Sequence, residues 1–308
     1  MNAEVFADWL ERQGHKIYKT SDSYWFDAAP RVLQAFPYHW LISPVEEEIH
    51  GLMKKHGIIA MRYSATTGHR EGKMSYHIVQ NSCYDLYSVK HQARNGVKRG
   101  LEKFRVEEIT FDRLADEGWQ LQEDTLVRQH RPGAMSRKQW NLLCHAAKDL
   151  PGFHALGAIS GTSLAGAMIV CQIDDIITVP YSMSHCRYLH EHVNNAMFFS
   201  ASCQLLKWDG VKGIFFCVES LDAPSKVDEF KFRMGFQAKP VRQRVEFNPL
   251  LKAIAVPSMH KLTRKLSGYF PSNSQIAKAE GMLRFYLEGK MPSSSQTIPG
   301  CPVPVIPS

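Results

Sequence analysis

Residues 213–236 constrain the possible folds of this chain more than any other segment. They read GIFFCVESLDAPSKVDEFKFRMGF, which predicts a buried strand over 214–218, a polar turn and a short helix that stops at Gly235. Upstream, an apolar run over 176–183 predicts a second buried strand, and a helix is expected over 194–208. Strand, helix and strand in one sheet form a right-handed crossover, so we expect the two strands to be parallel neighbours.

The composition is that of a globular protein with a modest positive charge. The chain has 308 residues, 44% of them hydrophobic and 22% charged, and its net charge of +7 favours an anionic ligand or partner. Seven scattered cysteines without a CxxC pair argue for a reducing compartment and against a zinc ribbon or a disulfide framework. The sequence contains no recognisable secretory signal or membrane-spanning run, so we expect a cytoplasmic protein without a bound metal.

The chain is long enough for two ordinary domains. Helical and strand patterns alternate along it, and strands are denser in the second half. We expect four parts: an N-terminal half (1–109), a C-terminal half (110–248), two amphipathic helices that pack on the core (249–290), and a disordered tail rich in Pro and Ser (291–308).

The order of these elements resembles a known family of transferases. Strand, loop, helix and strand are followed by a short helix with the string Phe230-Lys231 and then Gly235-Phe236, and this order resembles the acyl-CoA-binding half of the GNAT acyltransferases. It is more similar still to the FemAB-type branch, in which two GNAT-like halves are fused, and the similarity covers roughly residues 156–246. The resemblance implies an α/β (α+β) fold with tandem GNAT-like halves, in which mixed sheets are flanked by helices.

The same resemblance implies a reaction. An acyl or aminoacyl group would move from a thioester or ester carrier to an amine by direct attack, which would make the chain a transferase. The implied donor is an acyl-CoA such as acetyl-CoA, or an aminoacyl-tRNA, and the acceptor is a small-molecule or peptide amine. Positioning and oxyanion stabilisation would supply the catalysis, without a metal.

The resemblance places Phe230 and Lys231 in the acyl-transfer channel. Lys231 would stabilise the negative charge that develops on the carbonyl oxygen, a role that requires a fixed cation. Adjacent helical residues lie about 100° apart, so Phe230 can be buried while the Lys231 amine reaches the cleft beside Tyr181 or Glu219. The alternative is a surface lysine next to a core phenylalanine.

A group of polar residues precedes the helix expected from residue 194. Arg187, His190 and His192 lie just upstream of its N-terminus, which Asn194 or Asn195 would cap. The N-terminus of a helix attracts phosphate, so these five residues are the candidate cofactor-binding residues. The glycine-rich loop of GNAT enzymes is missing here, and the alternative is an ordinary Asn-capped helix with solvated histidines.

Glu219 and His185 are the candidate proton acceptors. Glu219 follows the strand at 214–218, and the carboxyl ends of parallel strands face a ligand cleft. His185 has the right chemistry for a base that acts on an amine acceptor, and the alternative is a structural or surface histidine.

A basic stripe indicates a second function, of a different class. Lys90, Arg94 and Lys98 recur at i, i+4 and i+8, so they share one face of a helix. Such a stripe can follow a phosphate backbone, and the alternative function is therefore a non-catalytic GNAT-fold protein that binds RNA or another polyanion through the basic helix 90–105. The same stripe is also typical of the solvated face of an amphipathic helix.

Overall fold

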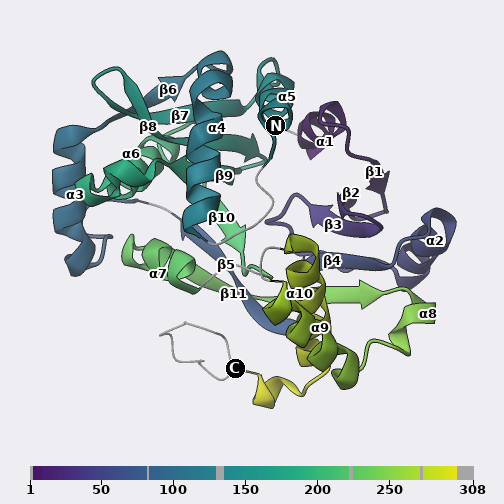
Figure 1. Cartoon of the computed structure of the whole chain (residues 1–308). Coiled ribbons are helices and arrows are strands. Elements are labelled where there is room, and N and C mark those ends of the chain that lie inside the picture. Colours follow the sequence, from purple (N-terminus) through teal and green to yellow (C-terminus); the bar gives the residue numbers. More distant parts are fainter. Residues whose placement is uncertain (1–2, 82, 130–134, 222–224, 271–272, 297–308) are drawn as a thin grey trace.

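A computed structural model describes residues 3–81, 83–129, 135–221, 225–270 and 273–296 (Figure 1). Within these residues, eleven strands join in one mixed sheet in the order β1-β2-β3-β4-β11-β5-β10-β9-β8-β7-β6. The strands are β1 (Ile17–Lys19), β2 (Tyr24–Ala29), β3 (Val32–Phe36), β4 (Ala60–Ala65), β5 (Lys73–Asn81), β6 (Arg105–Ile109), β7 (Phe153–Ser160), β8 (Ser163–Ile173), β9 (Ile176–Ser184), β10 (Gly213–Val218) and β11 (Gln237–Phe247).

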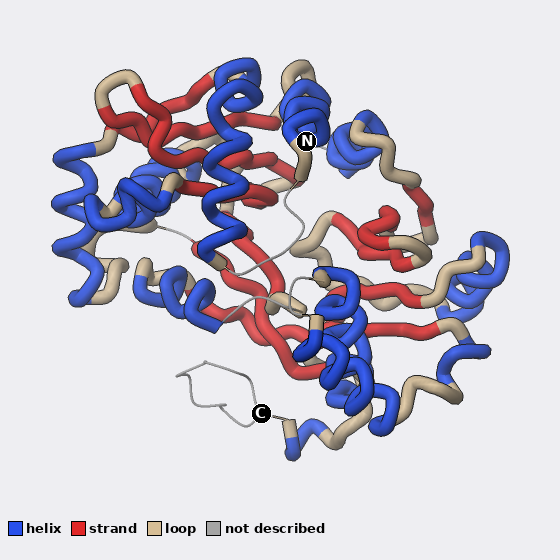
Figure 2. The backbone as a smooth tube through the Cα atoms, in the orientation of Figure 1, coloured by secondary structure: helices blue, strands red, loops and turns tan. Residues whose placement is uncertain are grey.

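Helices cover both faces of this sheet, as Figure 2 shows with helices in blue and strands in red. They are α1 (Ala3–Arg12), α2 (Glu46–His56), α3 (His91–Lys103), α4 (Phe111–Arg128), α5 (Arg137–Ala147), α6 (Val193–Leu205), α7 (Ser225–Arg233), α8 (Pro249–Lys252), α9 (Pro257–Tyr269) and α10 (Ser274–Gly289), with the short 3-10 helices η1 (Cys186–Glu191) and η2 (Ser293–Ser295). Along β8, Met168 and Val170 pack with α3 and α6, whereas Ile169 and Cys171 pack on the opposite face with α1, α4 and α5. The mixed α/β fold expected from the sequence is confirmed.

The expected parallel pair is also confirmed. β9 and β10 are parallel neighbours, with Ile176 opposite Gly213 and Thr178 opposite Phe215, and α6 connects them. The segments that pair are largely buried between the helices on the two faces of the sheet, as is typical of parallel strands.

At the centre of the sheet, strands from distant parts of the chain interleave. β11 lies between β4 and β5, and β5 lies between β11 and β10, so each expected half contributes a strand that pairs with the other. β6, which precedes the expected boundary at residue 109, pairs with β7. In the expected tail, residues 293–295 form η2 and Gln296 accepts a hydrogen bond from the Met74 backbone at 2.6 Å, whereas residues 297–308 lie outside the described residues.

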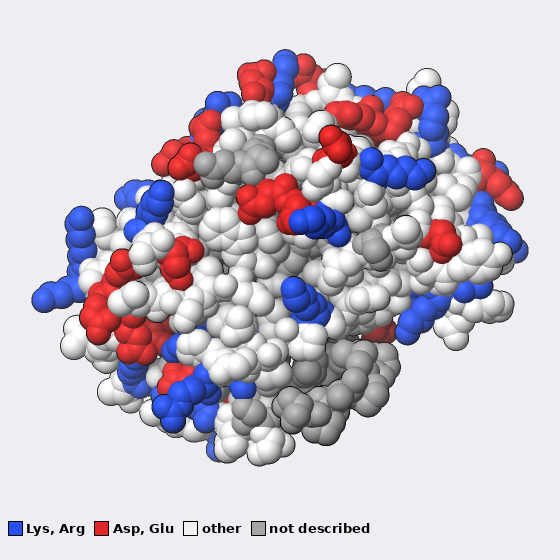
Figure 3. All heavy atoms as spheres, turned by 180° about the vertical axis from the view of Figure 1, so that it is seen from behind, with Lys and Arg blue, Asp and Glu red and all other residues white. Residues whose placement is uncertain are grey.

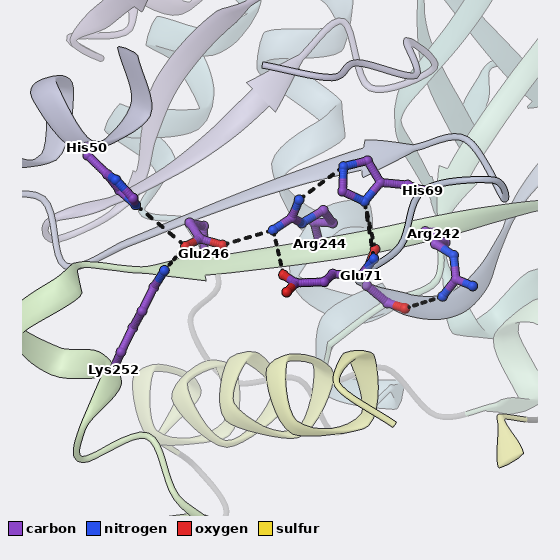
Figure 4. A network of polar contacts seen from close by, with 8 residues as sticks. His50, His69, Glu71, Arg242, Arg244, Glu246 and Lys252 are labelled. Carbon is purple, nitrogen blue, oxygen red and sulfur yellow. Dashed lines mark hydrogen bonds and ion pairs between the residues drawn. The ribbon is translucent and has the colours of Figure 1, made fainter. Parts of the chain in front are cut away.

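A polar network around the buried side chain of Arg244 connects β11 to the turn between β4 and β5 (Figure 4). The Arg244 guanidinium donates to Glu71 at 2.9 Å and to Glu246 at 3.2 Å, and it lies 3.1 Å from the His69 ring. Arg242 donates to the Gly72 carbonyl at 2.7 Å. These contacts hold β11 against the turn that joins β4 and β5.

Gly235 ends α7 at a point of close backbone contact. Its φ is 89°, and a Cβ at this position would lie 2.1 Å from the carbonyl oxygen of Ser88. We expect Gly235→Ala to lower the free energy of unfolding by about 3 kcal/mol, because strain in a left-handed conformation and overpacking add. Urea denaturation measures this loss.

Gly210→Ala is the matched control for that substitution. Gly210 has a φ of 73°, but a Cβ at this position would have no neighbouring atom within 4 Å, so only the left-handed strain of about 1 kcal/mol applies. Equal losses in the two variants would show that the contact between Gly235 and Ser88 relaxes at no cost.

Candidate active site

β9 and β10 separate part-way along their length, and a cavity opens between them. Their pairing ends at Thr178 and Phe215, although β9 continues to Ser184 and β10 to Val218. The cavity has a volume of about 250 Å³. It is lined by Gln34, Tyr38, Arg62, Thr178, Val179, Pro180, Phe215, Phe216, Cys217 and Val218.

A bulge in β9 contributes to this opening. Between the pairs that Thr178 and Tyr181 make with β8, the two residues Val179 and Pro180 face the single residue Val170. Proline has no N–H and cannot continue a strand ladder. Beyond the last parallel pair, the facing backbone groups of β9 and β10 no longer pair with one another, so they are open to hydrogen bonds from an extended ligand.

The Lys231 amine lies against the wall of this cavity. Its Nζ is 3.0 Å from the Sγ of Cys217, a lining residue, and 3.2 Å from Asp228 Oδ1. The Tyr76 hydroxyl donates to the other Asp228 oxygen at 2.9 Å. Burial lowers the pKa of Lys231, but Cys217 and Asp228 together outweigh it, so the pKa is raised and the amine is a cation. Tyr181 and Glu219, the neighbours expected from the sequence, are not its hydrogen-bond partners.

Glu219 lies one residue beyond β10 and forms a close ion pair. Its Oε2 is 2.6 Å from Lys73 Nζ, and its backbone carbonyl accepts a hydrogen bond from Arg62 at 2.7 Å. Arg62 also lines the cavity, so Glu219 lies next to the cavity wall. The Lys73 ammonium fixes the position of this carboxylate, which keeps further lone pairs that can accept a proton.

Phe230 and Tyr181 pack on opposite faces of the sheet. Phe230 is half-buried, less than the full burial expected, and packs edge-on against Phe198 at 5.2 Å. Tyr181 packs between Trp9 and Trp140 on the opposite face, where burial raises its pKa to about 12. Tyr181 is not among the residues that line the cavity.

The expected cap of α6 is wrong. The helix begins at Val193, its N-cap is His192 with a φ of 66°, and Asn194 and Asn195 therefore lie in its first turn. The reason is that η1 leads into α6 through this one left-handed residue. α3 also packs closely here, because a Cβ on Gly100 would lie 2.7 Å from the His192 carbonyl oxygen.

The remaining loop candidates lie at the surface. Arg187 is exposed and stacks on the neighbouring Tyr188 ring at 4.5 Å, and His190 is exposed beside Glu191. His185 Nδ1 lies 2.8 Å from Asp124, on a segment that does not line the cavity.

The basic stripe is partly exposed. Lys90 precedes α3 and is exposed, as is Lys98, whereas Arg94 is half-buried and folds back to donate to the Val89 and Tyr87 carbonyls. Figure 3 shows acidic and basic side chains interspersed over one face of the molecule, so that face carries no field of a single sign.

Several residues of the site were missed by sequence reasoning. Cys217 and Asp228 flank Lys231, and Asp228 precedes it by three residues on α7, a spacing that signals contact on a helix. Arg62 and Tyr76 come from β4 and β5, more than 150 residues away from their partners Glu219 and Asp228. No local pattern points to them.

Comparison with solved structures identifies the fold. A structure of FemX aligns over 81% of this chain and 93% of its own, with 9% identity and a TM-score of 0.54. The C-terminal domain of a putative lysylphosphatidylglycerol synthetase from Agrobacterium fabrum aligns over 78% and 87%, with 11% identity and a TM-score of 0.51. The chain therefore has the GNAT-like α/β fold that was expected, and it shares this fold with FemX.

This GNAT-like fold is recognised through structure. No model of a protein family matches the sequence, and no curated protein matches it. A conserved protein of unknown function from Bacteroides thetaiotaomicron aligns over 79% of this chain and 90% of its own, with 10% identity and a TM-score of 0.53. At these identities the likeness concerns the fold, so the reaction has to be argued from the site.

Proposed function

We propose that this chain is an acyltransferase that moves an acyl or aminoacyl group from a thioester or ester carrier to an amine. The cavity between β9 and β10, with the Lys231 amine 3.0 Å from its lining residue Cys217, carries the proposal. An extended acyl arm would form hydrogen bonds with the backbone groups of β9 and β10 that no longer pair with each other. Lys231 would then stabilise the charge that develops on the carbonyl oxygen.

Proton transfer in this reaction is assigned to Glu219. The attacking amine loses a proton once it has bonded to the carbonyl carbon, and the carrier leaves with its oxygen or sulfur. Glu219 lies beside the cavity residue Arg62 and carries a carboxylate. Lys73, which pairs with that carboxylate, would hold it in position.

The candidate carriers are an acyl-CoA and an aminoacyl-tRNA. The start of α6 is covered by α3 and preceded by η1, and Arg187 and His190 are exposed beside Tyr188 and Glu191. Both carriers bear phosphate groups, so the thermal-shift comparison below distinguishes between them. The acceptor would be a small-molecule or peptide amine, and we propose a cytoplasmic setting.

A thermal-shift experiment with acetyl-CoA and with aminoacyl-tRNA tests the proposal. A ligand at about 100 times its Kd stabilises the folded state by about 2.7 kcal/mol, which we expect as a shift in melting temperature of about 5 °C. Gln34→Trp, which fills a cavity wall, should abolish the shift, and Gln120→Trp on the exposed surface of α4 should retain it. If neither donor shifts the wild type, or Gln34→Trp responds normally, the cavity is not the donor site.

The same experiment distinguishes the acyltransferase from the alternative function, a non-catalytic protein that binds a polyanion. Lys90 and Lys98 are exposed, which suits a polyanion. Stabilisation by RNA that declines steeply with salt and does not depend on Gln34 would favour the non-catalytic binding protein.

A further inference from the structure

The surface of α8, α9 and the segments that flank them is unlike the rest of the molecule. Among the described residues, thirteen large apolar side chains are exposed, and seven of them lie between residues 250 and 270. Leu250 is 88% exposed, Tyr269 67% and Phe270 54%. Contiguous exposed apolar side chains in a folded protein mark an interaction surface.

α9 presents two distinct faces. His260 faces α10, because its ring lies 2.8 Å from Glu280 on that helix, and Thr263 is half-buried. Leu262, Leu266 and Tyr269 recur at i, i+4 and i+7 on the outer side and are exposed. α9 packs on α10, which in turn packs on β11 and β5, so the outer side of α9 faces away from the sheet (Figure 1).

The charge of this surface is of one sign. Residues 249–270 contain no Asp or Glu, and Lys261, Arg264 and Lys265 are all exposed on α9. Lys265 lies over the Tyr269 ring at 5.9 Å, which places a cation at the edge of the apolar stripe. An amphipathic helix with an apolar stripe and flanking Lys and Arg binds in the interface of an anionic bilayer, where the ammonium groups meet lipid phosphates.

We propose that α8 and α9 form a docking surface for an anionic lipid bilayer, with Leu262, Leu266 and Tyr269 inserted among the acyl chains and Lys261 and Lys265 on the phosphates. Charge complementarity selects this occupant. A second copy would bring like charges together, and residues 297–308 carry no acidic side chain to match the cations. No helix within the described part of the chain has the length and apolar character for crossing a bilayer.

Flotation of the full chain with lipid vesicles tests the proposal. We expect binding to phosphatidylcholine vesicles that contain one third phosphatidylglycerol, and little binding to phosphatidylcholine alone. Lys261→Glu with Lys265→Glu should weaken binding at least about 10-fold, because each cation near an anionic surface contributes about 1 kcal/mol. Leu262→Glu with Tyr269→Glu should abolish it. All four positions are exposed, so the melting temperature should be unchanged.

Lys54→Glu with Lys55→Glu is the matched control, since it makes the same change in net charge on the exposed surface of α2. We expect this variant to bind like the wild type. Equal loss in the two charge variants would reduce the effect to net charge and overturn the proposal. The proposal would also be overturned if the wild type did not bind these vesicles. It would be overturned as well if the surface were occupied by a second copy, in a dimer that Leu262→Glu disrupts, or by residues 297–308, so that binding appeared only after their removal.

Discussion

Replacing Lys231 by Met is expected to lower the rate of acyl transfer about 100-fold, the typical loss when one donor to a developing oxyanion is removed. The loss should fall on kcat more than on KM, because the negative charge on the carbonyl oxygen exists only in the transition state. Steady-state release of the free carrier measures the rate. Lys55→Met, an exposed lysine on α2, is the control and should transfer at the wild-type rate.

The structure adds a stability effect to this variant. Lys231→Met leaves Asp228 with its Tyr76 hydrogen bond but without its ammonium partner. We therefore expect a fall in melting temperature of a few degrees, equivalent to about 1–2 kcal/mol, because a partly buried carboxylate loses its ion pair. Unchanged transfer together with this fall would leave Lys231 with a structural role only.

Replacing Arg244 by Ala is expected to lower the free energy of unfolding by about 3 kcal/mol, since one partner of a buried ion pair is removed. The side chain of Arg244 is 8% exposed and holds Glu71, Glu246 and the His69 ring (Figure 4). Glu246 keeps its contacts with Lys252 and His50, which limits the loss. Urea denaturation measures the difference.

Arg105→Ala is the matched control for Arg244. Arg105 also pairs with a glutamate two residues away, Glu107, but its side chain is 72% exposed. An exposed pair contributes about 0–1 kcal/mol, because water screens it and the long side chains lose entropy. A loss at Arg244 no larger than that at Arg105 would mean that the network of Figure 4 does not hold β11 in place.

Sequence reasoning succeeded where the signal is local. Short stretches of sequence are enough to predict the apolar strands β9 and β10, the helix between them and the Gly-Phe stop after α7. Because a helix connects the two strands, a right-handed crossover makes them a parallel pair. The prediction of the residue that caps α6 was wrong. Asn194 has the chemistry of a cap, but the preceding residues form η1 and the helix starts earlier.

By itself, the sequence determined the strands β9 and β10, the helix between them, their parallel arrangement, and the presence of a lysine on the short helix that follows. Those features depend on the spacing of apolar residues and on the order in which neighbouring elements follow one another along the chain. Only the tertiary structure decided that β5 and β11 interleave, and that Arg62, Lys73 and Tyr76 reach Glu219 and Asp228. Strand order and partners of buried charges depend on packing between segments far apart in the chain, and no local window contains that information.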